Sequence, residues 1–141
     1  MNTNTMELIG VHPVKHSDLG FNNTLFGGKL LYWLDGDSVA YAMQLCDTPE
    51  WLRYQSINVH LKSLQALVIL LRSMHQSMLS ELLLLLNVEA RRHNVYTGQQ
   101  NIILATDIKF VKVDEEGNPL PLEQKAINRF NKMQQEKLVK E

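Results

Sequence analysis

A single long helical pattern, set among short strand-like segments, limits most strongly how this chain can fold. Apolar or small side chains recur at three- and four-residue steps from Gly27 to about Cys46, a spacing that predicts one amphipathic helix. The turn sequence DTP follows at residues 47–49, and proline cannot continue a helix interior. Strands are expected before and after this helix, over Met6–Val14 and Tyr54–Val59. Because 141 residues suffice for one compact domain, we expect a single fold of the α+β class.

The C-terminal half shows equally clear patterns. Strands are expected at Asn87–Glu89 and Asn101–Val113. Turns are expected at residues 94–98 and 114–119. Beyond Leu122, apolar residues at helical spacing with a charged outer face predict an amphipathic C-terminal helix. We therefore expect a main domain over residues 1–122 and a terminal helix over residues 123–141.

Charge and cysteine content exclude several functional classes. The chain has 14 Lys and Arg against 15 Asp and Glu, a net charge of −1, whereas nucleic-acid binding favours a basic surface. Cys46 is the one cysteine, so an internal disulfide and a cysteine metal cage are excluded, and the five histidines show no metal-ligand spacing. Residues 1–5 lack the basic and apolar regions of a signal peptide. We expect a cytoplasmic protein that binds neither nucleic acid, nor membranes, nor a metal.

The segment Leu61–Leu86 departs from the strand-rich pattern. It holds 11 leucines among 26 residues and contains no glycine or proline. Lys62, Arg72, His75 and Glu81 interrupt it too often for a membrane span. Taken as printed, it predicts an apolar helix of about seven turns.

The pattern with the most chemical content is the start of the long helix. Gly27 and Gly28 have no Cβ, so a ligand or another backbone can approach them closely. The first N–H groups of a helix are unpaired and carry partial positive charge, so they can polarise a carbonyl group or hold an anion. Asp35 follows two turns later between apolar neighbours, where a carboxylate is costly unless it is paired or used. The same pattern also fits an ordinary capped helix with a partly exposed aspartate.

Three stretches of the sequence resemble one known family. They are TLFGGKLLYWLD at residues 24–35, NVEARRHNVYTG at residues 87–98 and IKFVKVDEEG at residues 108–117. Their order and spacing resemble those of the acyl-CoA thioesterases of the hotdog superfamily, particularly the cytosolic acyl-CoA hydrolase branch. The resemblance covers residues 6–60 and 87–122.

This resemblance implies a hotdog fold, in which one long central helix is wrapped by an antiparallel sheet. It also implies dimers with active sites at the subunit interface, often assembled into tetramers or hexamers. Asp35 would be the catalytic carboxylate, acting on water as a general base or on the thioester as a nucleophile. The amides near Gly27 and Gly28 would polarise the thioester carbonyl. The substrate would be an acyl-CoA, with coenzyme A as part of it and no separate cofactor.

The chain departs from the family at the second catalytic position. The family often has Asn four residues before the threonine of the motif, supplied by the facing subunit, and Gly just before that threonine. Gly20 and Asn23 occupy these positions here. Asn22 and Asn23 could supply the missing side-chain amide to catalysis, or both could be ordinary loop formers.

Further substrate contacts are expected beside the helix start and on a later strand. The residues expected to contact the substrate are Thr24, Leu25, Phe26, Gly27, Arg91 and Arg92. Arg91 and Arg92, with Lys62 or Lys109, could meet the phosphates of coenzyme A, but neighbouring residues on a strand point to opposite faces, so at most one of the two arginines does. A solvated strand end is the alternative for both. Cys46 is expected to be a core thiol.

The family pattern is missing from the leucine-rich segment. Where the family has a strand, a Gly-Asp turn, another strand and a Gly-x-Thr-Ser turn, residues 64–86 have neither turn. A shifted reading frame with permitted codons restores both turns in order and gives PASFGDIIEIHASVNAIGTTSIT, which alternates as strands do. We therefore hypothesise a pair of compensating frameshifts. Read as printed, the segment is expected to lose strand alternation and to expose apolar surface.

Three alternatives to a thioesterase remain open. They are another hotdog acyl-CoA enzyme such as a dehydratase, a non-catalytic acyl-CoA-binding module, and a product that does not fold. A dehydratase would need an acid–base pair such as His–Asp on its substrate, and the helix motif contains no histidine. Tight acyl-CoA binding without release of the thiol would identify a binding module.

Overall fold

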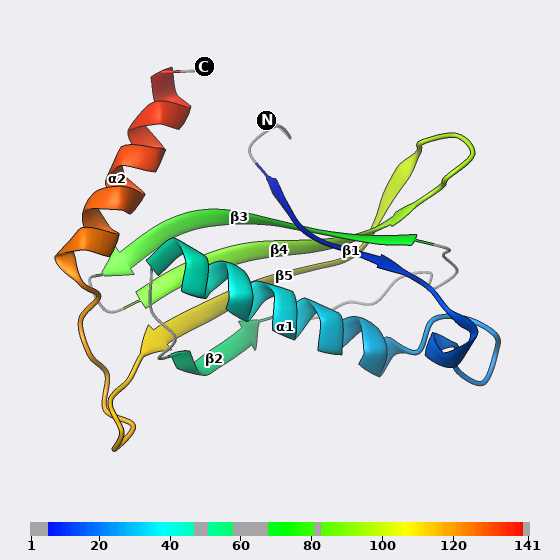
Figure 1. Ribbon diagram of the computed structural model, residues 1–141, viewed down its shortest axis with the longest axis horizontal. Coiled ribbons are helices and arrows are strands. Elements are labelled where there is room, and N and C mark those ends of the chain that lie inside the picture. Colours follow the sequence, from blue (N-terminus) through cyan, green and yellow to red (C-terminus); the bar gives the residue numbers. More distant parts are fainter. Residues whose placement is uncertain (1–5, 47–50, 58–67, 81–82, 140–141) are drawn as a thin grey trace.

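The computed structural model describes residues 6–46, 51–57, 68–80 and 83–139 (Figure 1). Its elements in chain order are β1 Glu7–Pro13, the short 3-10 helix η2 His16–Asp18, α1 Gly27–Cys46, β2 Trp51–Ile57, β3 Val68–Ser80, β4 Leu83–His93, β5 Gln100–Lys112 and α2 Gln124–Val139. The five strands form one sheet in the order β1-β3-β4-β5-β2, and every neighbouring pair is antiparallel. Since α1 lies along one face of this sheet, the expected α+β architecture with a central helix is confirmed.

The central helix packs through the side chains that form its sequence pattern. Leu30, Leu34, Ser38, Ala42 and Leu45 are buried at three- and four-residue steps along α1. The helix spans 20 residues, and both of its ends lie where the sequence predicts them. The side chains that complete this core come from β3, from alternate residues of β4 and from β5. Burial of these two apolar layers against each other holds α1 on the sheet.

The leucine-rich segment forms strands, so the apolar helix expected over Leu61–Leu86 is wrong for the residues that the structure describes. β4 pairs with β3 on one side and with β5 on the other, which places the leucines at its start in the centre of the sheet. Leu84, Leu86, Val88 and Ala90 are fully buried and the residues between them are half-buried, so β4 keeps the strand alternation that was expected to be lost. In β3, the consecutive residues Ile69, Leu70 and Leu71 are all buried. A central strand can be apolar on both faces, which is why an unbroken leucine run suits it.

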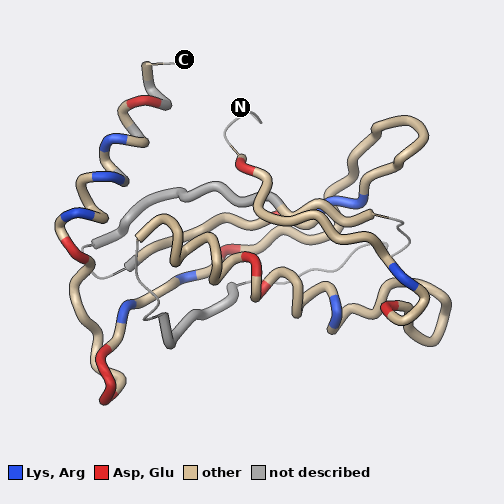
Figure 2. Tube along the Cα trace, in the orientation of Figure 1, with Lys and Arg blue, Asp and Glu red and all other residues tan. Residues whose placement is uncertain are grey.

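The other expected elements are present, some with shifted ends. β2 begins at Trp51, three residues before the predicted strand Tyr54–Val59, whose last two residues lie outside the described ranges. Residues 61–67 and 81–82 of the leucine-rich segment lie outside them as well. α2 is the amphipathic C-terminal helix; Ala126 is buried near its start, and the helix extends beyond the sheet with charges of both signs (Figure 1, Figure 2). None of the described helices is long and apolar enough to span a membrane.

Candidate functional site

The start of α1 presents two unpaired backbone amides. Phe26 caps the helix through its carbonyl oxygen, which accepts hydrogen bonds from Lys29 N at 2.9 Å and from Leu30 N at 3.2 Å. Within the described part of the chain, the N–H groups of Gly27 and Gly28 have no acceptor. The positive end of the helix dipole is therefore open to an oxygen atom that carries negative charge.

Gly28 has a steric reason to be glycine. A Cβ atom built on Gly28 would lie 2.6 Å from Cε1 of the Phe26 ring, well inside van der Waals contact. Gly28 itself is exposed. The second glycine of the motif therefore lets the Phe26 ring lie against the helix start while the amide stays accessible.

Asp35 lies on the same side of α1 as Gly28. The two residues are seven positions apart. In an α-helix this spacing is a rotation about 20° short of two full turns and a rise of about 10 Å along the axis. Asp35 is half-buried, and its carboxylate has neither a hydrogen-bond donor nor an ion-pair partner among the described residues. Both carboxylate oxygens can therefore accept hydrogen bonds from a substrate or a water molecule.

Exposed apolar side chains surround these two groups. Leu31, which lies on the same side of the helix as Gly28 and Asp35, is 37% exposed, and we call the surface of these three residues the open flank of α1. The rings of Phe26 and Tyr32 beside it are 60% and 71% exposed. Apolar surface gathered around a few polar groups is typical of a ligand site or a subunit contact.

The opposite flank of α1 holds a titratable pair that sequence reasoning missed. His12 Nε2 of β1 and Asp37 Oδ2 share a hydrogen bond of 2.7 Å, and the His12 ring stacks on Trp33 with 4.6 Å between the ring centroids. Gly10 makes room, because a Cβ atom there would overlap the Asp37 carboxylate. The paired residues are 25 positions apart, so local spacing does not reveal them. The available signal was Gly10 itself, since a glycine inside a strand often marks a close approach.

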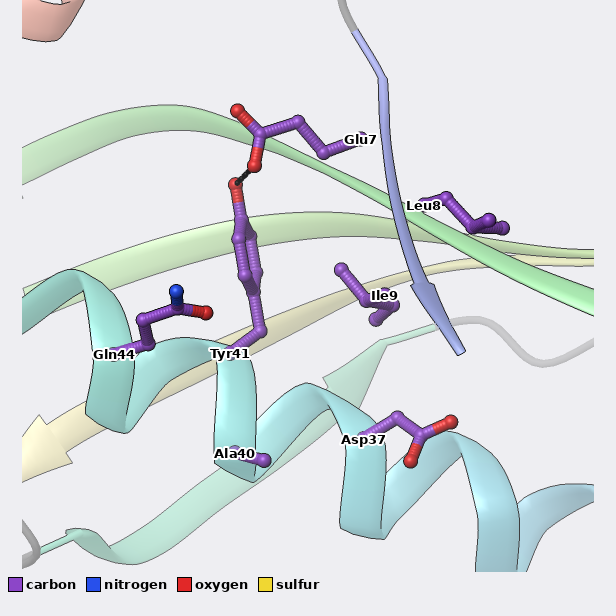
Figure 3. A pocket seen from close by; sticks show the side chains of 7 residues that line it. All are labelled: Glu7, Leu8, Ile9, Asp37, Ala40, Tyr41 and Gln44. Carbon is purple, nitrogen blue, oxygen red and sulfur yellow. Dashed lines mark hydrogen bonds between the residues drawn. The ribbon is translucent and has the colours of Figure 1, made fainter. Parts of the chain in front are cut away.

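Two further polar contacts join the same N-terminal segment to α1. Tyr41 Oη donates a hydrogen bond to Glu7 Oε2 at 3.1 Å, and Lys29 Nζ lies 3.7 Å from Asp18 Oδ1. Burial raises the pKa of Tyr41, and the Glu7 carboxylate raises it further by its charge and its hydrogen bond. Figure 3 shows the Glu7–Tyr41 bond beside a cavity of about 300 Å³ whose wall includes Asp37. This cavity is lined by β1 and α1 and lies away from the open flank.

The loop before α1 is tightly closed. Leu19 and Leu25 form an isolated β-bridge, and Gly20 N donates a hydrogen bond to Thr24 O at 2.7 Å. Asn23 has a φ of 55°, a left-handed conformation that suits glycine and that asparagine tolerates better than most other residues. Asn23 thus adopts a glycine-like backbone at the position where the resembled family has glycine.

The side chains of this loop differ in exposure. Asn22, Asn23 and Phe26 are exposed, and Thr24 is half-buried. Leu25 is 1% exposed and belongs to the hydrophobic core, so its side chain anchors the loop to the core. The structure therefore leaves the two asparagines and Phe26 accessible to another molecule, and Leu25 inaccessible.

The two arginines predicted to bind phosphates differ in their surroundings. Arg91 donates from Nη2 and Nε to Glu89 Oε2, at 2.6 and 2.9 Å, so its charge is already paired. Arg92 follows on the other face of β4 by strand alternation and also has an interaction partner. Both are half-buried rather than fully solvated. Cys46 is buried in the core, as expected.

Comparison with known proteins places this geometry on a known fold. No family model and no curated protein matches the chain. Solved structures do match, among them a hexameric thioesterase from Yersinia pestis, at 20% identity over 84% of this chain and 97% of that chain, with a TM-score of 0.68. A mutant acyl-CoA hydrolase from Staphylococcus aureus in complex with coenzyme A matches at 17% identity over 93% and 86% of the two chains, with a TM-score of 0.70.

An acyl-CoA hydrolase from Bacillus cereus matches as well, at 18% identity over 92% of this chain and 84% of that chain, with a TM-score of 0.65. At such identities the likeness shows a shared fold. The chain therefore has the hotdog fold, which is the fold expected from the motif at residues 24–35.

Proposed function

We propose that this chain is an acyl-CoA thioester hydrolase, which cleaves an acyl-CoA to a carboxylic acid and free coenzyme A. One observation carries the proposal. In the described part of the chain, the unpaired amide of Gly28 and the unpaired carboxylate of Asp35 lie on one open flank of α1, two turns apart. The amides of Gly27 and Gly28 would bind the thioester carbonyl oxygen and stabilise the negative charge that develops on it. The fold supports this proposal, because several matching structures are named as acyl-CoA thioesterases or hydrolases.

Of the two roles for Asp35, activation of water is the one we propose. The backbone positions of Gly28 and Asp35 are about 10 Å apart along the helix axis, which leaves room for a carbonyl group bound to the Gly28 amide and a water molecule hydrogen-bonded to Asp35. Asp35 would take a proton from the water as the water oxygen bonds to the carbonyl carbon. The tetrahedral intermediate then expels the coenzyme A thiolate as the C–S bond breaks, and the thiolate takes up a proton.

A second copy of the chain would complete the site. The open flank and the exposed rings of Phe21, Phe26 and Tyr32 form apolar surface that no described residue of the same chain covers. Matching structures with this fold include hexameric thioesterases. An assembly through this surface would also let the exposed Asn22 side chain reach the site of a facing subunit. Light scattering is expected to give a dimer or a larger multiple of it; a stable monomer would contradict a shared site.

The deciding experiment measures thiol release from acyl-CoA thioesters of increasing chain length. The wild type is expected to release the thiol, and Asp35→Asn to lower kcat by about a hundredfold or more. Asp37→Asn is the matched control, because this carboxylate lies two residues away on the opposite flank and is bonded to His12. Equal losses in the two variants would contradict the role of Asp35. Tight acyl-CoA binding without thiol release by the wild type would identify a binding module instead.

A further inference from the structure

Asp18 is a buried carboxylate where η2 meets the loop that leads to α1. It is 5% exposed. Its Oδ2 accepts a hydrogen bond from Lys15 N at 2.9 Å, and its Oδ1 lies 3.7 Å from Lys29 Nζ. Its backbone oxygen accepts a hydrogen bond from Phe26 N at 2.9 Å. One residue thus connects η2, the capping residue of α1 and the third residue of that helix.

Several interactions compensate for burying this carboxylate. A buried charge is costly unless hydrogen bonds and opposite charges replace its lost hydration. Asp18 has the Lys15 amide, the Lys29 ammonium and the positive end of the α1 dipole near it. Lys29 is itself held over the Tyr32 ring, 5.4 Å from the ring centroid. Together these contacts fix the direction in which α1 begins.

We propose that Asp18 is a positioning residue of the active site, because it holds the Phe26 peptide so that the amides of Gly27 and Gly28 point at the thioester carbonyl oxygen. This inference rests on the proposed hydrolase function. Asp18 does not touch the substrate in this role, since its carboxylate is buried among its own contacts. Its carboxylate, held by Lys15 N and Lys29, positions its backbone oxygen, which accepts the hydrogen bond from Phe26 N. The Phe26 carbonyl oxygen in turn accepts the first helical hydrogen bonds.

A loosened helix start would affect the transition state more than the binding of substrate. Negative charge develops on the carbonyl oxygen only as water bonds to the carbon, so amides aimed at that oxygen raise kcat more than they lower KM. A displacement of about 1 Å can lower the rate by about a hundredfold. A residue with a merely structural role would change the amount of folded enzyme and leave the kcat of each folded site unchanged.

The test compares thiol release by the full-length wild type, Asp18→Asn, Lys29→Met and Lys29→Arg, with rates expressed per folded protein. Asp18→Asn keeps the side-chain shape and removes the charge that faces Lys29. Its kcat is expected to fall by about tenfold or more, with KM changed by less than about threefold. Lys29→Met is expected to lower kcat in the same way, and Lys29→Arg to restore it. Glu115→Gln and Lys132→Met change exposed charges elsewhere and are expected to match the wild type.

The outcomes separate this inference from the function on which it rests. A wild type that releases no thiol from any acyl-CoA overturns both. If the wild type is active and Asp35→Asn is defective, but Asp18→Asn has an unchanged kcat, the positioning role is overturned and the proposed function stands. If Asp18→Asn does not fold, the Lys29 variants decide. A loss of kcat in Lys29→Met that Lys29→Arg restores supports the role, and a wild-type kcat in Lys29→Met overturns it.

Discussion

Asp35 and Asp37 lie two residues apart on α1 and face opposite flanks of the helix. Asp37 is hydrogen-bonded to His12 of β1, whereas no described residue pairs with Asp35. Two positions on a helix correspond to about 200° around its axis, so one carboxylate meets the edge strand and the other lies on the open flank. Two groups of the same chemistry thereby acquire different surroundings: Asp37 connects β1 to the helix, and Asp35 has no partner among the described residues.

The Asp37 contact predicts opposite effects for two glycine-to-alanine substitutions. Gly10→Ala would place a Cβ atom 2.8 Å from Asp37 Cγ, and we expect it to lower the free energy of unfolding by about 1–3 kcal/mol. Gly36→Ala is the matched comparison, because nothing lies within 4 Å of a Cβ atom there. Since alanine favours a helix interior, it should raise the free energy of unfolding by about 0.5–1 kcal/mol. Urea unfolding followed by circular dichroism measures both values.

The control for this prediction is Gly10→Ala in an Asp37→Ala background. If overlap with the carboxylate causes the loss, Gly10→Ala should destabilise the protein less once the carboxylate is gone. An equal loss in both backgrounds would show instead that alanine disturbs the backbone of β1.

Asn23 is expected to matter through its backbone conformation. Because its φ is 55°, Asn23→Gly should change the free energy of unfolding by less than about 0.5 kcal/mol, and Asn23→Ala should lower it by about 1 kcal/mol. Asn22→Ala, at the exposed neighbouring position, is the matched control for stability and should have little effect on it. Thiol release by Asn23→Gly then tests the chemistry: a stable but inactive variant would show that the Asn23 amide takes part in the reaction.

The parts of the fold that could be predicted from the sequence are those with local patterns. α1 begins and ends at the predicted residues, because its buried positions repeat along one segment and proline follows its end. The turn between β4 and β5 is also predicted, because glycine is typical of turns. In the structure Gly98 has the positive φ that such a turn favours. The leucine run has no period that separates a strand from a helix, so only its pairing with β3 and β5 reveals the strand.

The candidate site was predicted only where its residues are close in sequence. Gly28 and Asp35 belong to one helix, and their spacing alone places them on one side of it. His12 and Asp37 come together because the N-terminal segment runs antiparallel to α1. The sequence signal for this packing is Gly10, which indicates a close approach but does not identify the partner. The contact between Asp18 and the helix start belongs to the same packing.

The raised pKa of Tyr41 predicts that the protein loses stability at alkaline pH. Burial and the Glu7 carboxylate raise the pKa of Tyr41 above its usual value of about 10. Above that pH the unfolded chain releases the phenolic proton while the folded protein keeps it, so the free energy of unfolding falls as the pH rises. Tyr41→Phe should flatten this decline between about pH 10 and pH 12, as measured by urea unfolding across the range. Tyr32→Phe, at an exposed ring, is the control. The same slope in Tyr41→Phe and the wild type would contradict the prediction.

The hypothesis of compensating frameshifts predicts the tryptic peptides of protein made from its own gene. The shifted reading has no arginine at position 72, so it should yield one long peptide from Ser63 to Arg91. The printed sequence instead gives cleavage after Arg72 and the peptide SMHQSMLSELLLLLNVEAR. Because the printed residues also form paired strands, a folded protein by itself does not favour either reading. Mass spectrometry distinguishes the two, and finding only the printed peptide would overturn the hypothesis.

For the printed sequence, strand pairing predicts that the effect of alanine substitution alternates along β4. Leu84 and Leu86 are fully buried, so Leu84→Ala and Leu86→Ala should each lower the free energy of unfolding by about 2–5 kcal/mol. Leu85 is half-buried on the other face, so Leu85→Ala should lower it by less than about half as much. In a helix, residues 84 and 86 would lie about 200° apart, and both could not be buried on one side. Similar losses at all three positions in urea unfolding would therefore contradict the strand. A smaller loss at Leu85 than at Leu84 and Leu86 would show the two-residue alternation of a strand.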